Sequence, residues 1–171
     1  GDGTVYPGWP IQMDRYVGAS ASAGDVNNDG IMDVVMESRN LLYVWNKDGQ
    51  LLPGFPFAIL DSLVGSNSYS APVLVDLTGD GKLEIVFCSH SDVTNAGGII
   101  YAVKYDGTNL PGFPKTVPNW IYGAPIVADI DGDSQLEIII GEYGSSPTPY
   151  FSIFAYNVDG SFVTDFPTGP Y

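Results

Sequence analysis

The chain has 171 residues, of which 44% are hydrophobic, and this is enough for one folded domain with a real core. Its net charge is −14, with only six Lys and Arg residues, which argues against nucleic acid and anionic membranes as partners. No stretch is long and apolar enough to predict membrane insertion, and the single cysteine, Cys88, excludes an intrachain disulfide.

Three acidic loops dominate the chain. They read DVNNDGIMD at 25–33, DLTGDGKLE at 76–84 and DIDGDSQLE at 129–137, and their first aspartates recur at intervals of 51 and 53 residues. A period near fifty indicates one supersecondary unit in tandem. We therefore predict a single repeat array over 1–171, with the tail of a preceding repeat at 2–20 and repeats at 21–68, 69–121 and 122–171, the last with a terminal edge segment.

Each repeat predicts a series of strands in chain order. A strand of small residues precedes each loop (21–24, 70–75 and 123–128), and a β-branched strand follows it (34–36, 85–88 and 138–140). A third strand, at 42–45, 99–103 and 151–156, ends in an Asp-Gly pair that predicts a hairpin turn, at 48–49, 106–107 and 159–160.

A segment with the pattern Pro-Gly-aromatic-Pro completes the unit, at 7–10, 53–56 and 111–114, and in reduced form at 165–167. Proline cannot donate to a ladder, so this segment is expected at an edge strand or a bend. Four strands with the last at an edge describe a propeller blade. The predicted fold class is all-β, with tandem four-stranded antiparallel blades of β-propeller type. About three blades are too few to close a ring, because propellers have about four to eight.

The loops carry the candidate metal ligands. Oxygen side chains occupy the first, third, fifth and ninth positions, and the seventh would add a backbone carbonyl. Carboxylates and neutral oxygens without sulfur or imidazole favour a hard cation, and a flexible loop suits Ca²⁺ better than Mg²⁺. The candidate set, one Ca²⁺ per loop, is Asp25, Asn27, Asp29, Ile31 and Asp33; Asp76, Thr78, Asp80, Lys82 and Glu84; Asp129, Asp131, Asp133, Gln135 and Glu137.

The sixth loop position is expected to need a positive φ. Gly30 and Gly81 satisfy this requirement, whereas the third loop has Ser134, so the third site is predicted to be the weakest.

Two other interpretations compete with calcium sites of this kind. An EF-hand requires a glutamate at position twelve and flanking helices, but Met36, Phe87 and Ile140 stand there, within predicted strands. Solvated acidic turns are the plain alternative, and three copies in register disfavour it.

The combined pattern resembles a known family. An Ala-Pro strand, the acidic loop, a β-branched strand and then Asp-Gly with Pro-Gly-Phe-Pro is similar to the FG-GAP/VCBS repeats of integrin-α-like propellers and bacterial or archaeal surface proteins. The resemblance covers nearly the whole chain and implies Ca²⁺ bound by the loop carboxylates on one face. It also implies adhesion, scaffolding or ligand recognition at the cell surface or outside the cell, usually without catalysis.

The leading functional hypothesis is a non-catalytic, calcium-stabilised extracellular module for surface assembly or adhesion. Its expected partners are other copies of itself or further blades of a longer chain, with filaments forming through open edges, and surface proteins or glycans. The alternative is a carbohydrate-binding or polysaccharide-lyase propeller fragment, with Trp120, Tyr122, Tyr143 or Tyr150 as a sugar platform. A Cys88–His90 nucleophile pair is disfavoured, because Cys88 reads as a buried small hydrophobe.

Overall fold

A computed structural model describes residues 2–13, 17–59, 66–67, 69–91, 97–143 and 152–164. These residues form strands, turns and bends, and none of them lies in a helix that could span a membrane. The strands are β1 (Ser22–Gly24), β2 (Asp33–Ser38), β3 (Leu41–Trp45), β4 (Phe57–Ala58), β5 (Ser66–Asn67), β6 (Val73–Val75), β7 (Glu84–Ser91), β8 (Gly98–Val103), β9 (Lys115–Val117), β10 (Ile126–Ala128), β11 (Glu137–Gly141) and β12 (Ile153–Tyr156).

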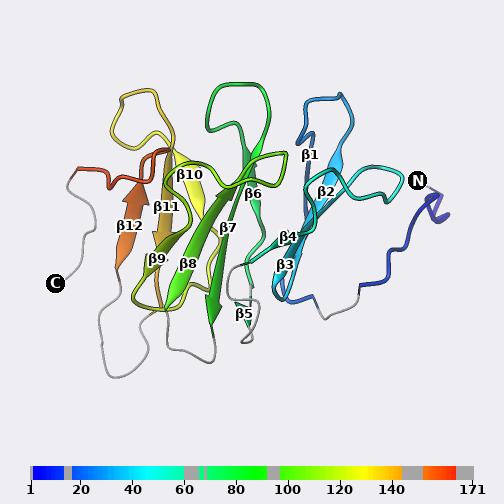
Figure 1. Cartoon of the computed structure of the whole chain (residues 1–171), viewed down its shortest axis with the longest axis horizontal. Coiled ribbons are helices and arrows are strands. Elements are labelled where there is room, and N and C mark those ends of the chain that lie inside the picture. The colour runs from blue at the N-terminus through cyan, green and yellow to red at the C-terminus, as the bar shows by residue number, and fades with distance from the viewer. Residues whose placement is uncertain are drawn as a thin grey trace.

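The strands form three antiparallel sheets that lie side by side (Figure 1). The first has the order β1-β2-β3-β4 and the third β10-β11-β12. In the second, β5-β7-β8-β9 are in order and β6 also pairs with β7. The innermost strands of all three sheets lie together, with β6 next to both β1 and β10. This arrangement confirms the predicted all-β fold of tandem, open blades.

Prolines explain where the structure departs from the predicted strands. The inner strands of the second and third repeats begin only at Val73 and Ile126, directly after Pro72 and Pro125, because a proline cannot donate to the ladder. For the same reason the Pro-Gly-aromatic-Pro segments form turns, and the edge strands β4 and β9 follow them. The prediction that these segments form an edge strand or a bend is therefore confirmed as a turn, with the edge strand beginning directly after it. Strand β5 was not predicted, and the reduced segment at 165–167 lies outside the described residues.

The core consists of two layers, one on each side of the middle sheet. Side chains alternate along a strand, so β7 sends Ile85 and Phe87 towards the first sheet and Val86 and Cys88 towards the third. All six residues of β8 are buried, because its side chains alternate between two core layers that cover both faces of the sheet. The unbroken apolar runs of the second repeat thus belong to a sheet that is covered on both faces.

Glycine pairs connect successive repeats. The turn around Gly54 lies directly on the turn at Asp106-Gly107 of the next repeat, and a Cβ at Gly54 would overlap the Asp106 carbonyl. The same contact joins Gly8 to Asp48-Gly49 and Gly112 to Asp159-Gly160. All six glycines have a positive φ, between 73° and 90°. We call the turns around Gly8, Gly54 and Gly112 the Pro-Gly turns, and the turns at Gly49, Gly107 and Gly160 the Asp-Gly turns. The two kinds of turn pack backbone against backbone, which only glycine permits.

The predicted Asp-Gly hairpin turns are confirmed. In the first repeat the Gly49 N–H donates to the Asn46 carbonyl at 3.0 Å and the Asn46 N–H donates to the Gln50 carbonyl at 2.9 Å. The turns at 106–107 and 159–160 repeat this pattern, with the corresponding bonds between 2.8 and 3.0 Å. Each turn is therefore a rigid platform for the preceding repeat.

Candidate metal centres

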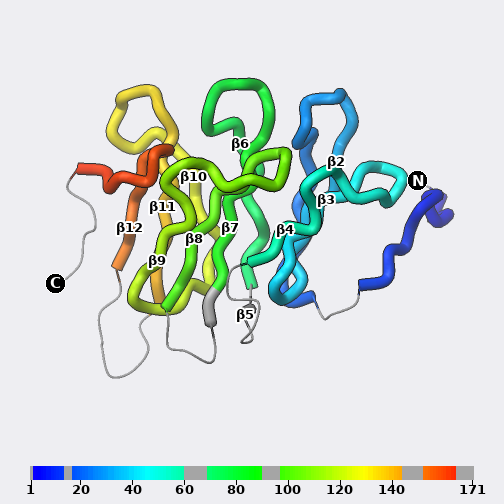
Figure 2. Tube along the Cα trace, viewed as in Figure 1, coloured from blue at the N-terminus to red at the C-terminus, as the bar shows by residue number. Residues whose placement is uncertain are grey.

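The three acidic loops project from the same end of the molecule, between β1 and β2, between β6 and β7, and between β10 and β11 (Figures 1 and 2). Strand β6 lies next to β1 and β10, which aligns the loops as neighbours. The Leu83 N–H of the second loop donates to the Val26 carbonyl of the first at 3.1 Å. The loops are thus connected through the backbone as well as through the sheets.

The first aspartate of each loop folds the backbone around its own carboxylate. In the first loop, Asp25 accepts the N–H groups of Asp29 at 2.9 Å and Gly30 at 2.7 Å. The equivalent bonds from sixth-position N–H groups to Asp76 and Asp129 measure 2.9 and 3.1 Å. A loop curled in this way is expected to turn the oxygens of alternate residues inward, as a cation site requires.

The fifth-position aspartates orient the next part of the loop. Asp29, Asp80 and Asp133 each accept the N–H of the seventh residue, at 2.8, 2.9 and 2.7 Å. The carbonyls of Ile31, Lys82 and Gln135 belong to those seventh residues, and their role as ligands stays a prediction. The side chain of Asp133 also accepts the Gln135 side-chain amide at 3.0 Å.

Two residues in each loop adopt left-handed backbone conformations. The sixth position has φ of 86° at Gly30, 84° at Gly81 and 70° at Ser134, so the predicted positive φ is confirmed in all three loops. A non-glycine residue in this region costs about 1–2 kcal/mol. At the sixth position Ser134 therefore carries strain that the two glycines avoid, while at the fourth position Asn28 of the first loop, with φ of 60°, stands where the other loops have Gly79 and Gly132. The weaker binding of the third site stays a prediction.

The ninth-position carboxylates are the buried members of the set. Asp33, Glu84 and Glu137 are at most 1% exposed, although they are charged side chains at the start of a strand. One oxygen of each accepts the N–H of the second loop residue, from Val26, Leu77 and Ile130, at 3.1, 2.9 and 2.8 Å. The other oxygen of Asp33 (Oδ1) and of Glu137 (Oε1) is buried with no hydrogen-bond partner. Such an oxygen is costly unless a cation binds it.

The electrostatics of these carboxylates point the same way. Burial, and then the neighbouring loop aspartates, raise the pKa of Asp33, Glu84 and Glu137, against the lowering effect of the backbone N–H bonds. The anionic form is thus disfavoured in the protein alone, both by desolvation and by like charges. A divalent cation bound at the loop would offset both the desolvation and the repulsion between like charges, and would favour the anionic form.

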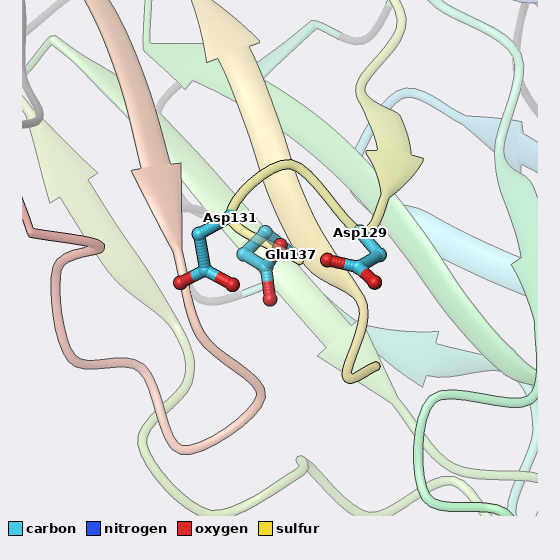
Figure 3. Close-up of side chains that lie close together, drawn as sticks. All are labelled: Asp129, Asp131 and Glu137. Carbon is cyan, nitrogen blue, oxygen red and sulfur yellow. The ribbon is translucent and has the colours of Figure 1, made fainter. Parts of the chain in front are cut away.

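In the third loop the carboxylates converge most closely. One oxygen each of Asp129, Asp131 and Glu137 lies within 4.8 Å of the others, with Glu137 rising from the base of the loop between the two aspartates (Figure 3). Among the described residues this is the one such group of acidic, histidine or cysteine side chains. The first and second loops carry Asn27 and Thr78 at the third position, so they offer a neutral oxygen where Asp131 stands.

The donor set fits Ca²⁺. It combines carboxylates with amide, hydroxyl and carbonyl oxygens on a flexible loop, and it contains buried oxygens that lack a partner. The side chains at the first, third, fifth and ninth positions and the carbonyl at the seventh stay the predicted ligands, and the fifth residue also shapes the loop by accepting the N–H of the seventh. The sequence pattern did not reveal the second function of the ninth carboxylate, which is to anchor the second loop residue by its N–H.

A pocket of about 580 Å³ lies beside the third loop, between the second and third repeats. Its walls include Asp131 and Asp133, the side chain of Lys104 and the Asp-Gly turn at Asp159. The third loop therefore borders a hollow with both polar and apolar walls.

The Cys88–His90 pair, disfavoured from the sequence as a nucleophile, gains no support from the described residues. Cys88 is buried between the second and third sheets, and burial raises the pKa of its thiol, which disfavours the reactive thiolate. The His90 backbone pairs with Asn67 and Gly98, and its side chain lies outside the described residues.

These features define a class of protein, an open array of β-blades with an acidic loop at the same end of each. Residues 25–87, which span the first two loops, match the family model described as FG-GAP-like repeat, and this match confirms the predicted resemblance over that part of the chain. No curated protein matches the chain. In the crystal structure of the V. cholerae biofilm matrix protein Bap1, a similar region has 20% sequence identity and a TM-score of 0.40, and covers 84% of this chain. The chain spans 27% of the length of that protein.

Proposed function

We propose that the chain is a non-catalytic, calcium-stabilised repeat module that acts outside the cell in surface assembly or adhesion. One observation carries the calcium part. The ninth position of each loop holds a buried carboxylate, and in Asp33 and Glu137 its second oxygen lacks a hydrogen-bond partner. The FG-GAP-like match supports a repeat module, and calcium loops of this kind work best where free Ca²⁺ is high, which favours an extracellular location.

Calcium would act as a brace at the base of each blade. The ninth residue begins the second strand, and the first residue directly follows the inner strand, so an ion between them ties the two strands together. Without the ion, several carboxylates of like charge face one another in each loop. Metal binding and folding are therefore coupled, and the ion stabilises the folded chain by mass action.

The calcium claim is tested by melting the chain in CaCl₂ and in EGTA, with MgCl₂ as the control for ionic strength and charge. We expect a higher melting temperature in CaCl₂ and a much smaller rise in MgCl₂, because Mg²⁺ demands a stricter octahedron. Equal melting temperatures in CaCl₂ and EGTA would refute the proposal. Titration calorimetry then counts the ions, for which up to three are expected.

The assembly role rests on the edges of the array. Among the described residues no strand pairing joins the first sheet to the third, and open β-edges are templates for association. Other copies, or further blades, are the proposed partners, and head-to-tail contacts that do not close would form filaments. Light scattering and electron microscopy of the purified chain test this part, and a monodisperse monomer at all concentrations contradicts self-assembly.

A carbohydrate-binding module is the second candidate, favoured by one group of rings. Tyr69, Tyr122 and Tyr143 are 46%, 40% and 55% exposed. Tyr122 lies 5.8 Å from Tyr69, 6.0 Å from Trp120 and 5.3 Å from Tyr143 between ring centroids. Tyr150, also a candidate, lies outside the described residues. Exposed aromatic rings can stack on the apolar faces of sugars.

A glycan array separates the two candidates. Binding that disappears with Trp120→Ala and persists with Tyr6→Ala, a similarly exposed ring away from the group, would support carbohydrate recognition. A folded chain that binds none of the glycans leaves the assembly module as the better description. A lyase would additionally release unsaturated products from an acidic polysaccharide.

A further inference from the structure

The three repeats meet at two equivalent interfaces, and different side chains close them. Tyr105 stands directly before the Asp-Gly turn of the second repeat and packs on the core between the first and second sheets. Val158 stands directly before the Asp-Gly turn of the third repeat and packs on the core between the second and third sheets. A large ring at the first interface is thus replaced by a small side chain at the second.

The seventh residue of the acidic loop differs between the two interfaces as well. Lys82 of the second loop extends over Tyr105, and its Nζ lies 3.6 Å from the ring centroid. Tyr105, and then the charges of Asp80 and Asp106, raise the pKa of this lysine. The first interface therefore contains an ammonium group that a ring and two carboxylates stabilise.

The second interface keeps the carboxylates but lacks the ammonium group. The fifth loop position and the Asp-Gly turn again hold aspartates, Asp133 and Asp159, whereas Gln135 stands where the second loop has its lysine. The Gln135 side-chain amide donates to Asp133 Oδ2 at 3.0 Å, so this side chain lies on its own loop. No cation from the seventh loop position reaches the second interface.

The pocket beside the third loop lies where the ring and the ammonium are missing. Its volume of about 580 Å³ is within the range of ligand pockets, about 300–1,000 Å³. Both Gln135 and Val158 line it, and Leu110 and Pro111 give it an apolar wall. The described lining residues include three aspartates and one lysine, Lys104, so acidic groups outnumber basic ones.

We propose that this pocket binds a lysine side chain of a partner protein. The alkyl chain packs on Leu110 and Val158, and the ammonium lies near Asp133 and Asp159, as the chain's own lysine does at the first interface. A basic partner also complements the net charge of −14.

The proposal goes beyond calcium binding and does not rest on it. Leu110, Val158 and Asp159 lie outside the acidic loops, so the pocket keeps these walls whether or not the loops hold an ion. A failed calcium test would leave the proposal unchanged, and a failed lysine test would leave the calcium sites unchanged.

A titration of the full chain with the peptide acetyl-Gly-Lys-Gly-amide, followed by NMR amide shifts, tests the proposal. The peptide acetyl-Gly-Gln-Gly-amide is the uncharged control, and CaCl₂ is present throughout so that the lysine peptide does not enter empty loops. We expect saturable shifts at the amides of Leu110, Val158 and Asp159 with the lysine peptide, and none with the glutamine peptide at the same concentration.

A filling variant provides the sharpest control. Gln135→Lys combined with Val158→Tyr places the Lys82–Tyr105 pair of the first interface into the second, while the carbonyl of residue 135 stays in the loop. We expect a folded protein that melts at or above the temperature of the parent. Its affinity for the lysine peptide should fall at least roughly tenfold, because the added side chains occupy the pocket.

A second pair of variants tests the carboxylate without filling the pocket. Asp159→Asn keeps Oδ1 as the acceptor of the Ser161 N–H, which measures 2.8 Å, and should weaken binding of the lysine peptide. Asp48→Asn changes the same position of the first repeat, away from the pocket, and should leave the binding unchanged.

Three results would overturn the proposal. Unchanged binding in both the filling variant and Asp159→Asn would mean that the peptide binds acidic surface elsewhere. Equal shifts with the glutamine peptide would mean that the ammonium is not recognised. Concentration-dependent shifts of the pocket amides without any peptide, absent from the filling variant, would make a second copy of this chain the occupant.

Discussion

Replacing Asp33 by asparagine should have opposite effects with and without calcium. Asp33 is fully buried, its Oδ2 accepts the Val26 N–H at 3.1 Å, and its Oδ1 has no partner. Asparagine keeps the shape and can keep the bond to Val26 through its own oxygen. Its amide nitrogen then takes the place of Oδ1, and the side chain no longer carries the negative charge that burial and the Asp25 and Asp29 charges disfavour.

The magnitude follows from what each state gains or loses. With EGTA, the substitution removes a buried negative charge whose unpaired oxygen costs about 1–3 kcal/mol. We therefore expect Asp33→Asn to be as stable as the wild type or more so, by on the order of 1 kcal/mol. At a free calcium concentration of about 100 times Kd, one bound ion adds about 2.7 kcal/mol to the free energy of unfolding, and a loop that no longer binds calcium loses this contribution. For a chain of this length that corresponds to a fall in melting temperature of about 5–11 °C.

Calorimetric melting of both proteins in CaCl₂ and in EGTA measures the two effects. Asp48→Asn is the matched control, because Asp48 is an exposed aspartate outside the loops that pairs with Lys47 at 2.7 Å. It should leave the calcium-dependent increment unchanged, since exposed ion pairs contribute little. An unchanged increment in Asp33→Asn, or equal destabilisation with and without calcium, would refute the assignment of this carboxylate as a ligand.

Three further outcomes are expected. Gly112→Ala should destabilise the chain by about 2–5 kcal/mol, from left-handed strain and overlap with the Asp159 carbonyl, whereas Gly123→Ala, with open space and no positive φ, should not; urea unfolding measures both. Phe87→Ala should cost about 3–5 kcal/mol by the same assay, because the ring is fully buried and stacks on Tyr101 at 4.8 Å. Melting curves in CaCl₂ and EGTA should converge as the pH falls into the carboxyl range. In EGTA the ninth-position carboxylates have raised pKa values, so the stability that they contribute in the protonated form is present at low pH and is lost as the pH rises through those values. In CaCl₂ the bound ion requires the anionic form, so protonation at low pH displaces calcium and removes its stabilisation. A gap between the curves that is independent of pH would contradict this linkage.

Local chemistry made much of the fold predictable from the sequence. The period of the acidic loops set the number of sheets, and β-branched runs after each loop marked β2, β7 and β11. The Asp-Gly pairs marked hairpin turns, because their backbone preferences hardly depend on the surroundings. The boundaries near Pro72 and Pro125 were also present in the sequence, as residues that cannot donate to a ladder.

The interactions between repeats were not predictable in the same way. The pairing of Gly54 with Gly107 joins two turns more than fifty residues apart, and each glycine alone reads as an ordinary turn residue. Strand β5 pairs with the end of β7 through Ser66 and Asn67, which carry no strong strand preference. In both cases tertiary contact, and not local propensity, decides the structure.

The position of the acidic loops gives the proposed calcium sites an effect beyond their own blades. The inner strand β6 lies between β1 and β10, and the Leu83 N–H of the second loop donates to the Val26 carbonyl of the first. Val26 is itself held by Asp33, so a cation on Asp33 would fix the carbonyl that receives the second loop. Binding in one loop should therefore order its neighbour, and this coupling has a consequence for titration. Calcium should bind the first and second loops with positive cooperativity, because the second ion finds a loop whose backbone is already ordered.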